Sequence, residues 1–247
     1  MKAVILAAGY GTRLYPLTKD KAKPLVEVND KPMINYVVDK LLEVDEIDEI
    51  VVVSNEAFYK QYTDWKKTYA EDVPLTIIND GTETKETRLG AVGDIHFTIQ
   101  ELNIIEEPML VIGGDNLFEF NLQDMVDTFN ETNRTVVGAV DLKDKELIKE
   151  RYGAIVADKK NVMTDFEEKP KKPSSTFAST CLYLFSEEDI ENLREYMEKE
   201  DKTDNTGDFI DYLSKNSVVV CHAFEEKWFD IGTHDQLEAA EKYLKKK

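Results

Sequence analysis

The sequence predicts an α/β fold in which a mainly parallel sheet carries helices on both faces and is joined to a smaller, strand-rich lobe. Three observations support this prediction. Short β-branched runs alternate with amphipathic stretches before about residue 150, which is the pattern of a mainly parallel sheet. Strand-like runs then follow one another closely, as in hairpins. The length of 247 residues suits one large domain with a subsidiary lobe.

The first part of the chain contains apolar, β-branched runs of strand length at Ala3–Ala7, Ile50–Ser54, Leu75–Ile78, Met109–Ile112 and Thr135–Val140. Stretches with one apolar face lie between these runs and predict helices at Met33–Leu42, Phe58–Tyr69, Thr87–Gln100 and Leu122–Phe129. Ligands bind at the carboxyl ends of the strands in such a sheet, so functional residues are expected directly after the strand-like runs.

The second part is predicted to form three closely spaced strands, two helices, one more strand and a final helix. In order, these are Tyr152–Val156, Val162–Glu167, Ser179–Phe185, Glu187–Lys199, Thr206–Ser214, Ser217–His222 and His234–Lys247. We therefore expect one continuous domain with a first part over about residues 1–150, a lobe over about 151–233 and a C-terminal helix over 234–247.

Charge and hydropathy exclude several classes of partner. Asp and Glu outnumber Lys and Arg by 50 to 31, and the resulting net charge of −19 repels phosphate backbones and anionic membranes. We therefore expect no nucleic-acid or membrane partner. The apolar run Ala3–Ala8 is too short for a signal peptide or a membrane span. Cys181 and Cys221 lack metal-binding or redox spacing, so a cytoplasmic location is expected.

The segment after the first predicted strand is rich in groups that bind phosphate. It reads Leu6-Ala7-Ala8-Gly9-Tyr10-Gly11-Thr12-Arg13-Leu14. The glycines let backbone N–H groups approach phosphate oxygens. Arg13 supplies a fork of donors, and Lys23 supplies a mobile point charge. Five of the first 24 residues are Lys or Arg, so positive charge is available here in an acidic chain.

Two common phosphate motifs are excluded at this segment. The chain has no Gly-Lys-Ser or Gly-Lys-Thr tripeptide, so the segment is not a Walker loop. A dinucleotide-binding fingerprint needs a small residue three positions after Gly11, where Leu14 stands. A glycine-rich surface turn is the structural alternative, and the Thr-Arg and Lys-Pro pairs that follow argue against it.

Two aspartates are candidate metal ligands. Asp115 closes the apolar run of residues 109–112 in the sequence Gly-Gly-Asp-Asn, where an unpaired carboxylate would be costly to bury. Asp230 lies between two apolar residues. Mg²⁺ binds one or two carboxylates together with phosphate oxygens, and both aspartates suit that role. The alternatives are a turn or helix-capping aspartate at Asp115 and a structural acid at Asp230.

These motifs resemble those of the sugar-phosphate nucleotidylyltransferases, the family of the glucose-1-phosphate thymidylyltransferases. Leu6–Leu25 is similar to the family's signature loop, and Gly113–Asn116 to its Gly-Asp-Asn element. Phe166–Pro170 is similar to its Glu-Glu-Lys-Pro element, and Trp228–His234 to its Trp-x-Asp-x-Gly-Thr segment. The resemblance spans nearly the whole chain and implies a Rossmann-like nucleotidyltransferase fold, with a nucleotide-binding first part and a sugar-binding lobe.

The resemblance also implies roles for individual residues. The nucleotide-binding set is Leu6, Ala8, Gly9, Gly11, Thr12, Arg13, Asp80 and Gly90. Arg13 and Lys23 are the catalytic cations, and Asp115 and Asp230 are the ligands of Mg²⁺. The set that binds the sugar 1-phosphate is Asn116, Gly153, Glu168, Lys169 and Thr180. For Glu168 and Lys169 the structural alternative is a solvated run of charges.

The chain departs from the thymidylyltransferases at two positions. Asn79-Asp80 stands where they have a Glu-Gln pair that reads the base, so the base stays open. Asp80 accepts from a base N–H in one interpretation and only starts a turn in the other. Thr206 stands where they have an Arg of the sugar-phosphate clamp, and Lys202 is a candidate replacement.

The expected function is the transfer of a nucleotidyl group from a nucleoside triphosphate to a sugar 1-phosphate, with UTP or dTTP favoured and pyrophosphate released. Two alternatives remain open. One is a cytidylyltransferase that acts on a sugar phosphate or a phospho-alcohol. The other is a regulatory subunit that binds nucleotide without catalysis, and the presence of both catalytic cations and both aspartates argues against it. The expected partners are the two substrates, and a homo-oligomer is left open.

Overall fold

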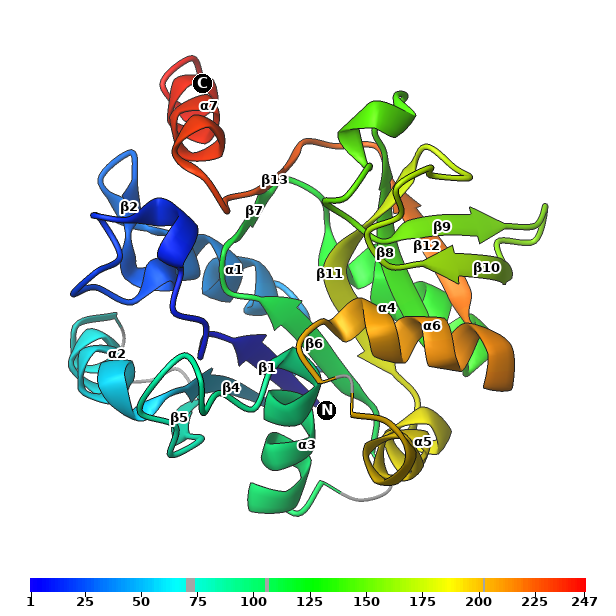
Figure 1. Ribbon diagram of the computed structural model, residues 1–247, viewed down its shortest axis with the longest axis horizontal. Helices are drawn as coiled ribbons and strands as arrows, with labels where there is room; N and C mark the ends of the chain where they lie inside the picture. The colour runs from blue at the N-terminus through cyan, green and yellow to red at the C-terminus, as the bar shows by residue number, and fades with distance from the viewer. Residues whose placement is uncertain (70–73, 105–106, 202) are drawn as a thin grey trace. The chain divides into compact units, whose positions relative to one another are not determined.

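The strand-like runs at the start of the chain form a parallel sheet in the computed structural model (Figure 1). β4 (Glu49–Ser54) lies between β1 (Lys2–Leu6) and β5 (Leu75–Asn79), and all three run in the same direction. Ala3, Val4 and Ile5 of β1 are completely buried. A strand covered on both faces has no polar side to present, which is why its sequence is continuously apolar.

The structure describes residues 1–69, 74–104, 107–201 and 203–247 and contains two compact units. Unit 1 consists of Met1–Leu89, Ile112–Glu119 and Lys227–Lys247, and unit 2 consists of Gly90–Val111 and Phe120–Glu226. β6 (Met109–Gly113) continues from unit 2 into unit 1. The position near residue 150 where we placed the start of the lobe lies inside unit 2, and the division into a nucleotide part and a sugar part stays a prediction.

Unit 1 also contains helices and two short antiparallel ribbons. α2 (Glu56–Tyr69) packs against β4 and β5. The ribbons pair β2 (Glu27–Val28) with β3 (Lys31–Pro32) and β7 (Asn116–Phe118) with β13 (Trp228–Asp230). The unit is completed by the short 3₁₀ helices η1 (Thr12–Leu14) and η2 (Lys23–Leu25) and by α1 (Met33–Leu41) and α7 (His234–Leu244).

The last helix is anchored by the face that its sequence predicts. Leu237 and Ala240 of α7 are buried, with Leu244 packed beside them, against Met33 of α1 and Ile231. The same cluster contains Leu117 of β7. This apolar cluster therefore joins α1, α7 and the segment around β7 in unit 1.

Unit 2 is built on strands that are mostly antiparallel. β11 (Phe177–Phe185) pairs antiparallel with β8 (Val136–Asp141) and β9 (Ala154–Ala157), and β9 forms a hairpin with β10 (Met163–Glu167). β12 (Val220–Phe224) runs parallel to β8. The helices of this unit are α3 (Ala91–Glu101), α4 (Leu122–Thr132), α5 (Glu187–Lys199) and α6 (Thr206–Asn216), with the 3₁₀ helix η3 at Lys145–Leu147.

The predicted α/β fold class is confirmed, and each run expected to be a strand or a helix forms one within a few residues. One boundary is wrong. We expected a helix from Thr87, but α3 begins at Ala91 because Gly90 has a φ of 82°, outside the helical region. Within the part of the chain that the structure describes, no helix is both long and apolar enough to cross a membrane.

Candidate active site

The predicted phosphate loop follows β1, and α2 holds its first residues in place. The carbonyl of Ala7 accepts a hydrogen bond from the Tyr62 hydroxyl at 3.1 Å, and the carbonyl of Ala8 accepts one from the Asn55 amide at 2.7 Å. Asn55 also caps α2, because its Oδ1 accepts from the backbone N–H of Phe58 at 3.0 Å. The start of the loop is therefore tied to the first turn of a helix.

Gly11 is required by the shape of the loop. Its φ of 58° lies in the left-handed region, and a Cβ there would come within 3.0 Å of Lys23 Cβ and 3.3 Å of Thr18 Cβ. The Thr18 hydroxyl donates to the carbonyl of Gly11 at 2.7 Å and fixes this turn. Gly9 differs, since a Cβ at Gly9 would meet no atom within 4 Å. The backbone at Gly9 is therefore open to the close approach of another group.

The catalytic cations predicted from the sequence both lie in unit 1. Arg13 is exposed on η1 next to Thr12, and its Nη2 lies 2.9 Å from the place that a Cβ of Gly232 would occupy. Lys23 begins η2, is only 11% exposed, and forms an ion pair with Asp115. The glycine of the Trp-x-Asp-x-Gly-Thr segment thus makes room for the Arg13 guanidinium.

Asp115 and Asp230 lie on neighbouring stretches of backbone. Asp115 occupies the turn between β6 and β7, and Asp230 ends β13, which pairs with β7. Asp230 stands opposite Asn116, and the N–H of Ile231 donates to the carbonyl of Asp115 at 3.0 Å. The N–H of Gly114, in the same turn, donates to the carbonyl of Leu6 at 3.0 Å. These bonds connect the carboxylate-bearing segments to the start of the phosphate loop.

The two aspartates fit a hard divalent cation. Carboxylate oxygens are the ligands that Mg²⁺ prefers, and one or two of them suffice when phosphate oxygens complete the shell. Asp115 is 27% exposed, so its carboxylate is accessible. The described residues include no group of three or more His, Cys, Asp or Glu side chains placed to hold a metal ion. The donor set therefore suits a cation that is bound together with a phosphate ligand.

Asp80 starts a turn, as the structural alternative predicted. Its Oδ1 accepts from the N–H of Thr82 at 2.7 Å and from the Thr82 hydroxyl at 2.8 Å. Its Oδ2 is buried and has no hydrogen-bond partner among the residues that the structure describes. The Tyr10 hydroxyl donates to the carbonyl of Thr82 at 3.4 Å, and burial raises the pKa of this phenol. Asp80 therefore shapes the loop beside Tyr10, and its contact with a base stays a prediction.

Gly90 lies in unit 2, at the start of α3. A Cβ at Gly90 would overlap the backbone of Thr203, whose carbonyl accepts from the N–H of Val92 at 2.9 Å. The carbonyl of Asp204 accepts from the N–H of Ala91 at 3.3 Å. The close approach of residues 203 and 204 thus accounts for the glycine, and a contact with the nucleotide base stays a prediction.

Glu168 is held in unit 2 between two glycines. A Cβ at Gly207 would overlap the Glu168 carboxylate, and a Cβ at Gly153 would lie 2.9 Å from Phe166 Cε2 and 3.2 Å from Glu168 Oε2. The Glu168 side chain is 16% exposed. Burial raises the pKa of its carboxyl, the Lys169 ammonium lowers it, and Asp208 raises it further.

Lys169 and Glu168 form one charged pair. The Lys169 Nζ lies 3.2 Å from Glu168 Oε1 and also donates to the side-chain carbonyl of Asn205. The Lys169 side chain is 45% exposed, so its ammonium is accessible to a ligand. The pair places a cation and a hydrogen-bond acceptor side by side, which suits a ligand that carries both a phosphate and hydroxyl groups.

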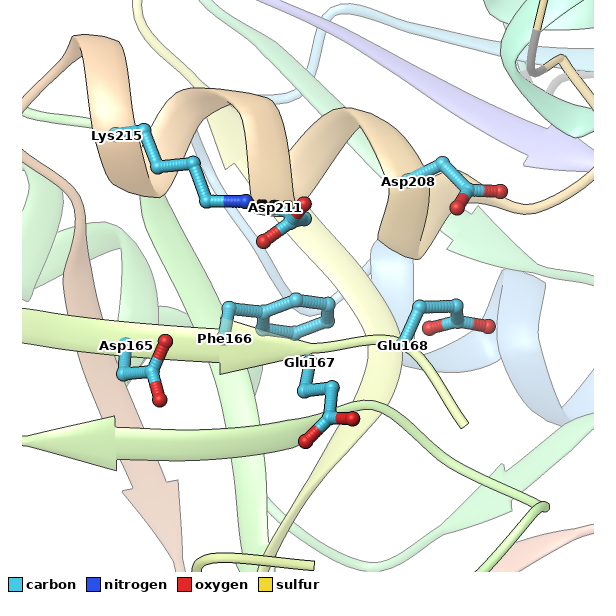
Figure 2. Close-up of a pocket in the computed structure, with 7 residues that line it drawn as sticks. All are labelled: Asp165, Phe166, Glu167, Glu168, Asp208, Asp211 and Lys215. Atoms are coloured by element: carbon cyan, nitrogen blue, oxygen red, sulfur yellow. Dashed lines mark hydrogen bonds and ion pairs between the residues drawn. The ribbon is translucent and has the colours of Figure 1, made fainter. Parts of the chain in front are cut away.

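An acidic cavity of about 340 Å³ opens beside Glu168, between β10 and α6 (Figure 2). Carboxylates dominate its lining, which consists of Asp165, Phe166, Glu167, Glu168, Asp208, Asp211 and Lys215. Lys215 is paired with Asp211 at 2.6 Å. The cavity therefore disfavours an anionic group.

Two predicted or candidate residues, Thr180 and Thr206, have their hydroxyls engaged away from this charged pair. Thr180 is 1% exposed, and its hydroxyl donates to the carbonyl of Gly138 at 2.9 Å inside the sheet. Thr206, at the position of the family's clamp Arg, is 8% exposed and shares a 3.0 Å hydrogen bond with the Tyr183 hydroxyl. Lys202 lies outside the described residues.

Comparisons with known proteins identify the family of the chain. The family model described as nucleotidyl transferase matches residues 2–247. The chain is 32% identical over 188 residues to the UTP–glucose-1-phosphate uridylyltransferase AglF of Haloferax volcanii, a match that covers 75% of this chain and 72% of AglF.

Solved structures are similar over almost the whole chain. One, assigned as a glucose-1-phosphate thymidylyltransferase of Bacillus anthracis and in complex with a sucrose, has a TM-score of 0.81 at 25% identity and covers 98% of this chain and 94% of that one. A UDP-glucose pyrophosphorylase complexed with UDP-glucose also has a TM-score of 0.81, at 23% identity, and covers 100% and 99%. The second likeness supports the fold alone. Because the family model matches almost the whole chain and AglF is 32% identical, the chain is an enzyme that belongs to the nucleotidyl transferase family.

Proposed function

We propose that this enzyme joins a sugar 1-phosphate to a nucleoside triphosphate, forming a nucleoside diphosphate sugar and releasing pyrophosphate. The observation that carries the proposal is in unit 1, where Lys23 pairs with Asp115 and the backbone of Asp115 is bonded to that of Ile231, next to Asp230. Cations and a pair of carboxylates beside a glycine-containing loop are the groups that nucleotidyl transfer needs.

The residues of unit 1 serve the triphosphate in this proposal. The backbone of Leu6, Ala8, Gly9, Gly11 and Thr12 forms the loop that receives the phosphates. Arg13 binds the β- and γ-phosphates with its fork of donors, and Lys23 offsets charge at the α-phosphate. Asp115 and Asp230 are the residues that would hold Mg²⁺, which would supply charge neutralisation for the leaving pyrophosphate.

The residues of unit 2 serve the sugar 1-phosphate. Lys169 binds the phosphate group, and Glu168 accepts hydrogen bonds from sugar hydroxyls. Gly153 lets the sugar and the Glu168 carboxylate approach bare backbone. Asn116 of unit 1 is 2% exposed, and both ends of its amide are hydrogen-bonded, to Gly113 and to Trp228. It therefore supports the site by holding these two residues rather than by touching the sugar.

An oxygen of the sugar phosphate attacks the α-phosphorus of the triphosphate in line. A new P–O bond forms at the α-phosphorus. The bond between the α-phosphorus and the oxygen that bridges the α- and β-phosphates breaks, and pyrophosphate leaves with that electron pair. The attacking oxygen is already anionic near neutral pH, so no general base is required. The chain's residues contribute position and charge, which is how phosphoryl-type transfers are generally catalysed.

UTP or dTTP is the preferred triphosphate in this proposal. The names of the relatives support a uridine or thymidine nucleotide. The AglF of Haloferax volcanii is a UTP–glucose-1-phosphate uridylyltransferase, and the similar structure from Bacillus anthracis is assigned as a glucose-1-phosphate thymidylyltransferase. Asp80 and Gly90 belong to the base-side part of the nucleotide-binding set, and Asp80 acts there by shaping the turn at Thr82.

A pyrophosphate-release screen of the four common triphosphates against a panel of sugar 1-phosphates tests the proposal. We expect release with UTP or dTTP that depends on both substrates and on Mg²⁺. Release with CTP and a phospho-alcohol instead would favour the cytidylyltransferase alternative, and no release with any pair would favour the non-catalytic one.

A further inference from the structure

Lys169 has a backbone conformation that residues other than glycine rarely adopt. Its φ of 46° lies in the left-handed region. Such a conformation persists where surrounding contacts determine it, and it is often found at functional positions. The contacts of the Lys169 side chain therefore indicate what holds the residue in place.

Asn205 is the neutral partner of the Lys169 ammonium. The Lys169 Nζ donates to Asn205 Oδ1 and pairs with Glu168 Oε1 at 3.2 Å. An ammonium has three N–H donors. These two contacts aim the ammonium and leave one donor for an anionic ligand, while the side chain stays 45% exposed.

The position of Asn205 makes this contact unexpected. Asn205 is the N-cap residue of α6, and an Asn there usually accepts a hydrogen bond from a backbone N–H of the first turn. The Asn205 side chain makes no such bond. Its Nδ2 donates instead to Asp208 Oδ2 at 3.2 Å, which turns Oδ1 toward Lys169. The amide is therefore oriented for the lysine rather than for the helix.

We propose that Asn205 is a positioning residue that holds the Lys169 ammonium where it meets the phosphate of the sugar 1-phosphate, an inference that rests on the proposed function. A neutral amide suits this task, because it orients the cation without cancelling its charge. Glu168 already neutralises part of that charge. Thr206, the residue after Asn205, carries no charge and has its hydroxyl bonded to Tyr183, so Lys169 is the cation that the described residues of this part of unit 2 offer to a phosphate.

Asn205→Ser separates positioning from helix capping. Serine is as good an N-cap residue as asparagine, but its hydroxyl is too short to reach Lys169. We expect the KM for the sugar 1-phosphate to rise about tenfold, as for the loss of one hydrogen bond to a charged group. The KM for the triphosphate, kcat at saturation and the melting temperature should stay close to those of the wild type.

Asn216→Ser is the matched control, since it makes the same substitution at the exposed last residue of the same helix, where the amide donates to the Tyr212 carbonyl. It should leave both KM values unchanged. Asn205→Thr, another capping residue without an amide, replaces Asn205→Ser if that variant does not fold.

A double-mutant cycle tests whether Asn205 acts through Lys169. In a Lys169→Ala background, Asn205→Ser should raise the KM for the sugar 1-phosphate no further. Two outcomes would overturn the positioning role but leave the proposed function intact. One is an unchanged KM for the sugar 1-phosphate in Asn205→Ser, and the other is a full additional tenfold rise of that KM in the Lys169→Ala background. Wild-type protein that releases no pyrophosphate with any sugar 1-phosphate would overturn the proposed function, and this inference with it.

Discussion

The indole N–H of Trp228 donates to Oδ1 of Asn116 at 2.7 Å, and this bond joins the two segments that carry Asp115 and Asp230. Asn116 is 2% exposed, and its Nδ2 donates to the carbonyl of Gly113 at 3.2 Å. Both ends of the buried amide are thus engaged within unit 1. This bond adds to the β7–β13 pairing and to the Ile231–Asp115 backbone bond, which together set the relative position of the two candidate metal ligands.

Trp228→Phe should weaken the fold and the binding of Mg²⁺ together. The substitution leaves a buried acceptor on Asn116 without its donor, which costs about 1–3 kcal/mol of the free energy of unfolding. Urea denaturation measures that loss, and the Mg²⁺ concentration for half-maximal rate should rise.

Trp65→Phe is the matched control for this variant. The Trp65 indole donates to Oδ1 of Asn35 at 2.8 Å, so the same type of bond is removed elsewhere in unit 1. It should reduce stability without changing the Mg²⁺ requirement. An equal change in Mg²⁺ requirement in both variants would show that the effect of Trp228→Phe reflects stability alone.

Asp115→Asn and Asp230→Asn should each lower kcat by at least about 100-fold, because the amide carries no charge for the metal. Circular dichroism should show an intact fold. Asp127→Asn, on the exposed face of α4, is the control and should keep wild-type kcat. Full activity of either active-site variant, or of the wild type in excess chelator, would contradict the metal assignment.

Arg13→Ala should lower kcat/KM by at least about 100-fold, or about 3 kcal/mol of transition-state stabilisation. Gly232→Ala should also lower kcat/KM, but by less. Its Cβ would lie 2.9 Å from Arg13 Nη2, so the guanidinium would have to move away. Steady-state kinetics with the triphosphate varied measures both. A Gly232→Ala enzyme with wild-type kcat/KM would mean that Arg13 does not act from the position seen here.

The pKa of Glu168 predicts a specific dependence of stability on pH. Burial is the largest cause that raises this pKa above its ordinary value of 4.5. A carboxyl with a higher pKa in the folded chain stabilises the fold where it is protonated, below the unfolded pKa, and this contribution is lost as pH rises through the folded pKa. The free energy of unfolding of the wild type, relative to Glu168→Gln, should therefore fall as pH rises above 4.5. Urea denaturation at several pH values measures it, and an increase would contradict the direction.

The fold was predictable because its main strands consist of continuous apolar runs. Residues 3–5 and 50–53 are fully buried, so no polar residue interrupts them. β7 and β13 were missed, since each is only three residues long and each contains a polar residue, Asn116 or Asp230. Their strand conformation depends on pairing between segments more than 100 residues apart, which local patterns do not report.

Candidate site residues were named from the sequence where a motif contains them, and none were named where only packing in the folded chain indicates a role. Arg13, Lys23 and Asp115 stand in segments with a clear chemical pattern. Asn205 was missed because an Asn before a helix is typical of an ordinary N-cap. The role of Gly207 was missed because its reason is the Glu168 carboxylate, which lies far away in the sequence.

The transfer of labelled phosphorus tests the central claim most directly. With UTP or dTTP labelled at the α-phosphorus, a sugar 1-phosphate and Mg²⁺, the label should appear in the nucleoside diphosphate sugar. With label at the γ-phosphorus, it should appear only in pyrophosphate. Label from the γ-phosphorus on the sugar, or no transfer of α-label with any sugar 1-phosphate, would contradict nucleotidyl transfer as the reaction of this enzyme.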